Sequence, residues 1–336
     1  MKEQRMRRRA LCILAAAASL DLPRPGNASA REDAKSLITW SGSVLGGVGT
    51  IQLHHPSPVV ARGLIGRCVA EIERLEMLFS LWRKDSCLSE LNRHGVLAAP
   101  PPDMVRLLGA ARRAATLTGG LFDVTIQPLW ALYLDHFAAE DARPEGPPRD
   151  AVEAALALVD QRRLLVSPDR IALTRKGMAV TLNGIAQGYV TDRVVDLLRG
   201  AGVSQTLVDL GESRAIGLHP AGRPWRAALE DPEIPGRLWG EVDLVDHALA
   251  SSGDGGFVFD PAGRFTHLLD PRSGHSPRLH RTVSVVAPDA TLADSLSTAF
   301  SLMPEGAIAA TLRPLPGVTA HVLRHDGSST LLQGPA

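Results

Sequence analysis

Two short segments in the C-terminal third of the chain contain side chains that could do chemistry together. Residues 266–274 read Thr-His-Leu-Leu-Asp-Pro-Arg-Ser-Gly and bring an imidazole, a carboxylate and a guanidinium into a turn-rich stretch. Further along, residues 293–298 read Ala-Asp-Ser-Leu-Ser-Thr, so Asp294 and Thr298 stand four residues apart and would share one face of a helix. Together the two segments indicate a metal-assisted phosphate site.

Each segment also has a purely structural explanation. Thr291 and Asp294 fit a capping box at a helix start, and the Thr298 hydroxyl could bond back into the same helix. The Asp-Pro pair at 270–271 is typical of a turn, and His267 could be a partly buried histidine without a role. Local spacing alone favours these explanations, and other segments of the chain are needed to decide against them.

Length and charge limit the classes of function. The chain has 336 residues, enough for one large domain or two smaller ones. Lys plus Arg and Asp plus Glu balance at 36 each, so no general field attracts nucleic acid or an anionic membrane surface. Aromatic residues make up only 4%, which argues against a base-stacking platform. We therefore expect no nucleic-acid partner, and any polyanion must be bound by local groups.

The first thirty residues have the pattern of an export signal. Several arginines between 5 and 9 precede an apolar run at 10–20, and Ala-Ser-Ala at 28–30 is the small-x-small pattern of a cleavage site. The sequence predicts a periplasmic protein exported by the twin-arginine or the Sec route, with residues 31–336 as the mature domain. The apolar run is too short for a membrane span, and no later segment is a better candidate. Cys68 and Cys87 are not expected to form a disulfide, because Cys68 fits a buried helix position.

The expected helices and strands follow each other without regular alternation, which favours an α+β fold. A helix at 62–79 has helical apolar spacing, and Asp103 can cap a helix that continues to residue 117. Another helix follows Gly188 and ends at Gly200 or Gly202. Residues 144–148 are expected to form a loop. Strands are expected at 50–54, 206–210, 226–229 and 283–287.

Six segments in order resemble one family. They are residues 79–86 with Leu91-Asn92, 118–125, 183–189 with Asp192, 210–212, 267–274 and 293–298. The chain resembles the ApbE family, the FAD:protein FMN transferases, over nearly all of its mature part. Each motif is weak alone, but six in order are hard to obtain by chance. The resemblance implies a T-fold-like mixed sheet with packed helices.

The resemblance also implies a specific activity. Members of the family are exported, bind FAD and Mg²⁺, and transfer the FMN half of FAD to a Thr or Ser hydroxyl of another protein, releasing AMP. The partner would be an exported or membrane-bound acceptor flavoprotein. The acceptor oxygen attacks one phosphorus of the pyrophosphate, and the negative charge that develops on the bridging oxygen is best stabilised by a hard cation.

The family pattern assigns roles to individual residues. Asp294 and Thr298 are the expected Mg²⁺ ligands with the backbone carbonyl of Gly184, because oxygen ligands suit a hard ion. His267 and Asp270 are the expected catalytic pair, since an acceptor hydroxyl needs deprotonation or orientation. Their division of labour stays open, because His267 could instead hold a phosphate.

Further residues are implied to bind FAD. The Gly-Gly-x-Phe-Asp segment contributes a close backbone approach and a carboxylate. Trp82 stands where relatives often have Tyr, so a ring can still stack on flavin or adenine, although Trp82 and Phe122 could equally be core residues. The predicted FAD-binding residues are Trp82, Leu121, Phe122, Asp123, Thr181, Gln187 and His267.

Three positions depart from the common family pattern. Gln187 replaces Lys or Glu, Thr181 replaces an acid, and Gly211-Glu212 replaces Gly-Gly. These changes resemble a proteobacterial branch associated with flavinylating membrane redox proteins, including the nitrous oxide reduction regulator. Two alternative functions stay open: a Mg²⁺-dependent FAD pyrophosphatase that gives FMN and AMP, and a non-catalytic periplasmic flavin carrier.

Overall fold

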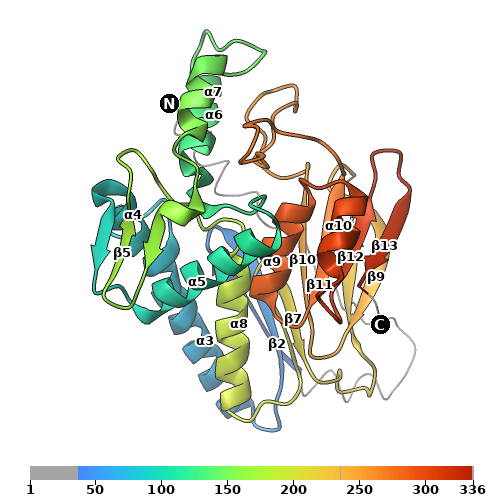
Figure 1. The fold of residues 1–336 in the computed structure, drawn as a ribbon. Coiled ribbons are helices and arrows are strands. Elements are labelled where there is room, and N and C mark those ends of the chain that lie inside the picture. Colours follow the sequence, from blue (N-terminus) through green and yellow to red (C-terminus); the bar gives the residue numbers. More distant parts are fainter. Residues whose placement is uncertain (1–36, 235, 335–336) are drawn as a thin grey trace.

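A large antiparallel sheet forms the centre of the molecule. The computed structural model describes residues 37–234 and 236–334. Eight strands pair antiparallel in the order β1-β2-β6-β7-β10-β11-β12-β13 (Figure 1). Their bounds are β1 Leu37–Val44, β2 Gly47–His54, β6 Thr206–Asp209, β7 Ser213–Ile216, β10 Ala248–Gly253, β11 Thr282–Ala287, β12 Thr319–Leu323 and β13 Ser329–Gln333.

Both faces of this sheet are covered, so its central strands are buried throughout. Every residue of β6 and of β11 is buried. In β6, Val208 belongs to the apolar core on the helix side, whereas its neighbour Leu207 belongs to a second core on the opposite face. That second core is closed by a two-stranded hairpin, β8 Trp225–Glu230 with β9 Leu238–Leu244. Successive side chains of a strand point to opposite faces, so central strands with two covered faces lose the apolar-polar alternation.

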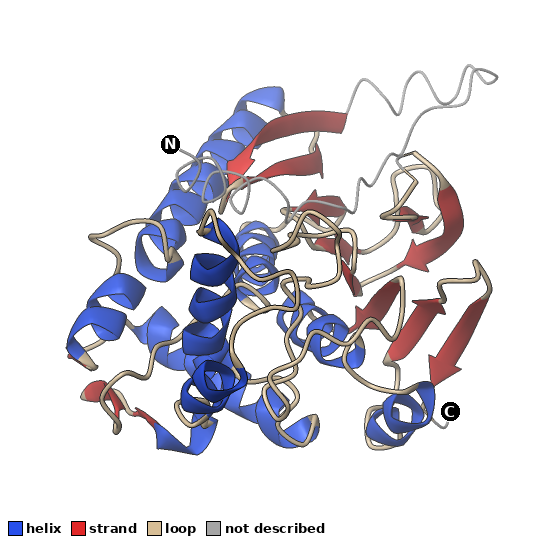
Figure 2. Cartoon of the chain, turned by 90° about the horizontal axis from the view of Figure 1, so that it is seen from above, coloured by secondary structure: helices blue, strands red, loops and turns tan. Residues whose placement is uncertain are grey.

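The main helices pack on one face of the large sheet (Figures 1 and 2). They are α3 Pro58–Phe79, α5 Pro102–Leu117, α8 Ala186–Gly200, α9 Ala290–Phe300 and α10 Glu305–Leu312. The buried residues of α3 recur with helical spacing, which gives the apolar stripe that faces the sheet. This arrangement, with helices segregated to one face of an antiparallel sheet, confirms the predicted α+β class.

Smaller elements lie beside and above this layer. A short sheet has the order β3-β5-β4, with β3 Val96–Ala98, β4 Leu164–Val166 and β5 Arg170–Leu173, next to α4 Cys87–His94. A 3₁₀ turn at Val124–Ile126 leads into α6 Gln127–Ala138, and α7 Arg149–Leu156 follows the loop predicted at 144–148. A separate aromatic cluster, with Trp130, Tyr133 and Phe257 among its members, joins α6 to the loop after β10.

Two capping expectations are wrong. Asp103 lies in the first turn of α5, but the cap position is Pro101 and has no side-chain cap bond. The Asp103 carboxylate instead receives hydrogen bonds from Arg74, Arg106 and Tyr189, because three helices converge on it. At the start of α9 the capping residue is Asp289, whose carboxylate accepts from the amide of Leu292, so the capping-box explanation for 291–294 also fails.

The remaining elements largely match the expectations. The helix predicted after Gly188 begins two residues earlier and ends at Gly200, and the helix predicted at 62–79 begins at Pro58. Cys68 is buried and both Cys68 and Cys87 are free thiols, as expected. Within the described part of the chain, no helix is long and apolar enough to cross a membrane. The predicted export signal at 1–30 lies outside the described residues.

Candidate active site

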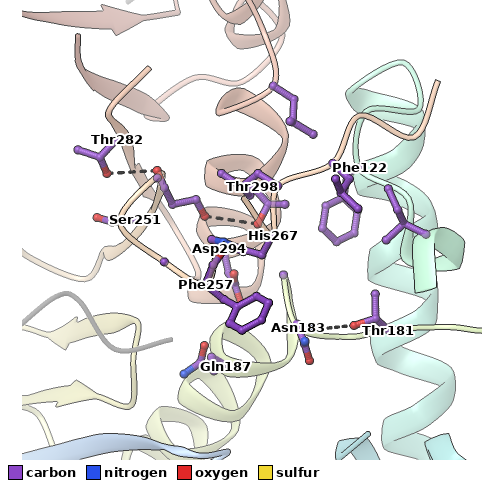
Figure 3. Close-up of a pocket in the computed structure, with 18 of the residues that line it drawn as sticks. Phe122, Thr181, Asn183, Gln187, Ser251, Phe257, His267, Thr282, Asp294 and Thr298 are labelled. Carbon is purple, nitrogen blue, oxygen red and sulfur yellow. Dashed lines mark hydrogen bonds between the residues drawn. The ribbon is translucent and has the colours of Figure 1, made fainter. Parts of the chain in front are cut away.

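A single pocket collects most of the predicted site residues at the ends of several elements. Its walls come from the turn before α8, from the inner face of α9, from the loop after β10, and from the 121–126 and 267–269 segments (Figure 3). Among the predicted residues, those that line the pocket are Leu121, Phe122, Asp123, Thr181, Gly184, Gln187, His267, Asp294 and Thr298.

The three predicted metal ligands lie close together. Asp294 and Thr298 share one face of α9, as their spacing predicts. A Cβ atom on Gly184 would lie 2.9 Å from the Thr298 hydroxyl, so the Gly184 backbone is in contact with that side chain. Asp294 Oδ2 accepts a hydrogen bond of 3.0 Å from the amide of Gly188 in the first turn of α8. The Thr298 hydroxyl faces Ser252 at 3.4 Å and not the carbonyl oxygens of its own helix.

The helices that supply these ligands are held in tight contact. A Cβ on Gly188 would lie 2.2 Å from the carbonyl oxygen of Ala290, so only glycine permits this approach of α8 to α9. One turn along α8, the Asp192 carboxylate accepts from the amides of Ala290 (2.8 Å) and Thr291 (2.9 Å) at the start of α9. Arg214 from β7 pairs with the same carboxylate at 2.5 Å. The relative position of Gly184 and Asp294 is therefore fixed by direct contacts between α8 and α9.

His267 is oriented by the loop that follows β10. Its Nδ1 lies 3.0 Å from the carbonyl oxygen of Phe257, and its backbone amide donates to the same oxygen. A carbonyl oxygen can only accept, so Nδ1 donates its proton and the neutral ring keeps a lone pair on Nε2. A Cβ on Gly256 would lie 2.2 Å from the ring, so the backbone of Gly256 packs directly against the imidazole. Burial lowers the pKa of His267, which keeps the ring neutral.

The electrostatic character of the pocket is acidic. Four acidic residues are among those that line it, Asp123, Glu212, Glu230 and Asp294, and no lysine or arginine of the described residues is among them. Burial raises the pKa of Asp294 to about 7, and burial next to Asp294 and Asp209 raises the pKa of Glu212. Such a pocket disfavours an anionic ligand unless a cation enters with it.

The donor set fits a hard divalent cation. No cluster of three or more His, Cys, Asp or Glu side chains that could hold a metal occurs in the described part of the chain. A site here would therefore depend on mixed oxygen donors, namely a carboxylate, a hydroxyl and a backbone carbonyl, with water and ligand oxygens completing the shell. This combination suits Mg²⁺ and disfavours softer metals that prefer thiolate or imidazole.

The predicted FAD-binding residues take different positions in the pocket wall. Asp123 uses its carboxylate locally, accepting from Thr125 through the amide (2.8 Å) and the hydroxyl (2.6 Å), and from the amide of Gln161 (3.0 Å). Gln187 is buried in the first turn of α8. Its amide lies against Gly211, where a Cβ would be 2.3 Å from Nε2 and where φ is +103°. Phe122 and Thr181 line the pocket on the side away from Ser251 and Thr282 (Figure 3).

Comparison with known proteins agrees with this geometry. The sequence profile of the ApbE family matches residues 45–322. The chain belongs to the ApbE family. An FAD:protein FMN transferase from Vibrio cholerae is 34% identical over 70% of this chain and 71% of the relative. One from Klebsiella pneumoniae is 28% identical over 83% of this chain and 80% of the relative.

Solved ApbE structures share the fold. The flavin transferase ApbE from Vibrio cholerae superposes with a TM-score of 0.75 at 27% identity, covering 88% of this chain and 97% of that structure. The ApbE protein from Thermotoga maritima gives a TM-score of 0.78 at 26% identity, with the same coverage. The fold predicted from the ApbE resemblance is thereby confirmed.

Two predicted site residues do not line the ApbE pocket. Asp270 accepts hydrogen bonds from the amide of Arg272 at 2.8 Å and from its guanidinium at 3.3 Å, so its carboxylate closes the turn after His267. Trp82 packs edge-on against Trp130 with ring centroids 6.5 Å apart, and it is Trp130 that reaches the pocket. The structure therefore brings His267 into one pocket with the predicted metal ligands, whereas Asp270 and Trp82 are not among the residues that line this pocket.

Among the lining residues that sequence reasoning missed, three contribute a large ring or a charge to the pocket. Trp130 stands in α6 among apolar neighbours, and nothing in the local pattern separates it from a core residue. Phe257 lies 5.8 Å from Trp130 between ring centroids and comes from a loop with no motif. Glu212 was recognisable only as a departure from the family's Gly-Gly, yet it projects an acid into the pocket.

Proposed function

We propose that this chain transfers the FMN half of FAD to a Thr or Ser hydroxyl of an acceptor flavoprotein and releases AMP, with Mg²⁺ held by Asp294, Thr298 and the Gly184 carbonyl. The names of its relatives, FAD:protein FMN transferase, support the substrate and the reaction. One structural observation carries the proposal. Among the described residues, the pocket that would hold a dianionic pyrophosphate is lined by four acidic residues and by no lysine or arginine.

The protein groups would divide the work as follows. Asp294 and Thr298 would hold the cation together with the Gly184 carbonyl, and the contacts of the Gly184 backbone with Thr298 and of the Gly188 amide with Asp294 support this assignment. When bound, the cation would neutralise negative charge on the pyrophosphate and on the leaving oxygen of AMP. The buried position of Asp294 strengthens this attraction, because electrostatic interactions are less screened away from water.

His267 would act as the base for the acceptor hydroxyl. Its Nε2 lone pair accepts the proton of the acceptor hydroxyl while the hydroxyl oxygen forms a bond to the phosphorus of the FMN half. The bond from that phosphorus to the bridging oxygen breaks, and AMP leaves with the bridging oxygen. Asp270 has no place next to the reacting atoms in this arrangement, so in the proposal it acts by fixing the turn that carries His267.

The aromatic walls would hold the ring systems of FAD. Phe122, Trp130 and Phe257 line the pocket and offer faces or edges for the flavin or the adenine. The amide of Gln187 and the hydroxyl of Thr181 are neutral polar groups beside the nucleotide site, in place of the charged residues common in the family. Trp82 would act only through Trp130, against which it packs.

The location of the reaction belongs to the same proposal. The arginine-rich and apolar segments within residues 1–30 support export to the periplasm by a cleavable signal. The acceptor would then be an exported or membrane-bound flavoprotein that presents its hydroxyl on the same side of the membrane.

An incubation with FAD and Mg²⁺, with and without a candidate acceptor, tests the proposal. The acceptor can be an exported flavoprotein with a Ser/Thr-Gly-Ala-Thr-like segment. We expect AMP release only with the acceptor, in equal amount to covalent flavin on that protein, and loss of both in Asp294→Ala. Equal AMP release without acceptor would instead identify an FAD pyrophosphatase, and stable binding of intact FAD in every arm would identify a carrier.

A further inference from the structure

Glu212 is an unusual residue in the wall of the candidate active site. It follows Gly211 in the turn between β6 and β7 and lines the pocket. Its side chain is almost completely buried, with 5% of its surface exposed. A glutamate in such a position normally has its carboxylate oxygens satisfied by hydrogen bonds or by a cation.

The carboxylate of Glu212 is only partly satisfied. The backbone amide of Ser251 acts on this carboxylate and lowers its pKa, which partly offsets the effect of burial. The second oxygen, Oε2, is buried and has no hydrogen-bond partner among the residues that the structure describes. Arg214, two residues along the chain, pairs with Asp192. The structure thus leaves one buried carboxylate oxygen in the pocket wall without a donor.

The surroundings of Glu212 add negative charge. Asp294 and Asp209 are the charged groups that act on it most strongly, and both are acids. Asp209 has its own local partners, the amide of Gly211 and the hydroxyl of Ser213, both at 3.1 Å. Asp294 lines the same pocket as Glu212 and is the predicted metal ligand. Two carboxylates that face one pocket repel each other unless a cation lies between them.

We propose that Glu212 contributes a second carboxylate to the divalent-cation site at Asp294. The inference rests on the proposed function, which supplies the cation and the other ligands. Two carboxylates would balance both charges of a divalent ion before any nucleotide binds. Asp294 with neutral donors alone would leave one positive charge of the ion without a compensating negative charge. The pocket is therefore expected to hold its cation without FAD, and the pyrophosphate would then meet a site that is already neutral.

Metal binding by the nucleotide-free protein tests this inference. Mn²⁺ serves as the probe, because it takes the same oxygen donors as Mg²⁺ and the free ion is measured directly by electron paramagnetic resonance. We expect wild-type protein to bind one Mn²⁺ per chain without FAD. Glu212→Gln should raise the Kd for Mn²⁺ by about 10- to 100-fold, the range seen when groups that support a metal site are removed.

Asp209→Asn is the matched control. It removes one buried negative charge next to Glu212, but the Asp209 side chain does not line the pocket. The Kd of this variant for Mn²⁺ should stay within about threefold of the wild-type value. The Asp209 carboxylate is hydrogen-bonded to other groups, so it acts on the cation only at a distance. Equal losses in Asp209→Asn and Glu212→Gln would overturn the inference, since they would show a general effect of charge.

A conservative variant separates ligation from folding. Glu212→Asp keeps the carboxylate but shortens the side chain, so it should bind Mn²⁺ more tightly than Glu212→Gln and less tightly than wild type, irrespective of the order of the melting temperatures. A wild-type Kd in Glu212→Gln would overturn the inference and leave Glu212 as a neutral buried acid. Absence of Mn²⁺ binding by nucleotide-free wild type would overturn it too, while AMP release in the transfer assay would still support the proposed function.

Discussion

Burial acts on the two central side chains of the pocket in opposite directions. It lowers the pKa of His267, which favours the neutral ring, and it raises the pKa of Asp294 to about 7, which disfavours its charge when no cation is near. A neutral imidazole is what proton acceptance requires, and a cation at Asp294 would have to displace the proton of this acid, so metal binding should weaken as the pH falls below about 7. Both properties follow from the same apolar walls around the pocket.

The pH dependence of transfer should reflect His267. The base must be neutral, and its pKa is lowered, so the rate at saturating FAD and Mg²⁺ should stay high below the ordinary histidine value of about 6.5 and fall only at more acidic pH. His267→Gln should lower kcat by about 100-fold or more. The Kd for FAD should change much less, because the ring is assigned to the acceptor.

Steady-state rates between pH 5 and 8, with FAD affinity measured by fluorescence, check this prediction. An acid limb that persists unchanged in His267→Gln would assign the titration to another group. A variant that loses FAD affinity and keeps kcat would make His267 a phosphate-binding residue.

At the scale of elements, α8 connects the site to the rest of the fold. Its first turn contacts Asp294, its second turn places Asp192 at the start of α9, and Tyr189 on the same helix donates to Asp103 of α5 at 2.7 Å. The predicted ligand residues of α9 therefore depend on the position of α8, which is set in part by packing against α5. Substitutions in this helix should affect both stability and metal binding.

Gly188→Ala tests the close approach of α8 to α9. The new methyl group would lie 2.2 Å from the carbonyl oxygen of Ala290, so one helix must shift. We expect a loss of about 1–3 kcal/mol in the free energy of unfolding, measured by urea denaturation, and weaker Mn²⁺ binding. Gly200→Ala, at the end of the same helix, has no heavy atom within 4 Å and should be neutral or stabilising by about 0.5 kcal/mol. Equal effects of the two substitutions would contradict the packing argument.

The charge cluster between α3, α5 and α8 predicts a change of stability with acid. Burial acts to raise the pKa of Asp103, but the hydrogen bonds from Arg106, Tyr189 and Arg74 outweigh it and lower the pKa to about 2. A folded-state pKa below the unfolded value of 3.8 gives stability that is present above pH 4 and is lost as the pH falls towards 2. Because both arginines are about half exposed, we expect only about 1 kcal/mol.

Urea denaturation of wild type and Asp103→Asn at pH 7, 4 and 2.5 measures this contribution. The difference between the two proteins should shrink between pH 4 and 2.5. A difference that stays constant over this range would show that Asp103 stabilises the fold by packing and not by its charge.

At the scale of the whole molecule, the α+β class could be predicted from the sequence, and the family motifs predicted which segments meet in one pocket. The spacing of Asp294 and Thr298, and their association with Gly184 and His267, could be inferred because those segments have family patterns. The strands β7 and β10 were among those missed, because both faces of the central sheet are covered and the alternation of buried and exposed residues is lost there. The sequence predicted Asp270 and Trp82 in the site because both belong to family motifs. Whether a side chain lines the pocket depends on the direction in which it points, and the sequence does not reveal that direction.

The acidity of the pocket also emerges only in the folded molecule. Asp123, Glu212, Glu230 and Asp294 come from segments far apart in the chain, and the balanced total charge gives no indication of their convergence. The central claim is that this pocket accepts the pyrophosphate of FAD only together with a divalent cation.

The affinity of wild-type protein for FAD, measured by calorimetry without acceptor in Mg²⁺ and in EDTA, tests that claim most directly. We expect binding to be at least about tenfold tighter in Mg²⁺, because the pocket is lined by acidic residues and by no described lysine or arginine that could neutralise a dianion. Equal affinity in the two buffers would contradict the account, since the protein alone would then neutralise the pyrophosphate.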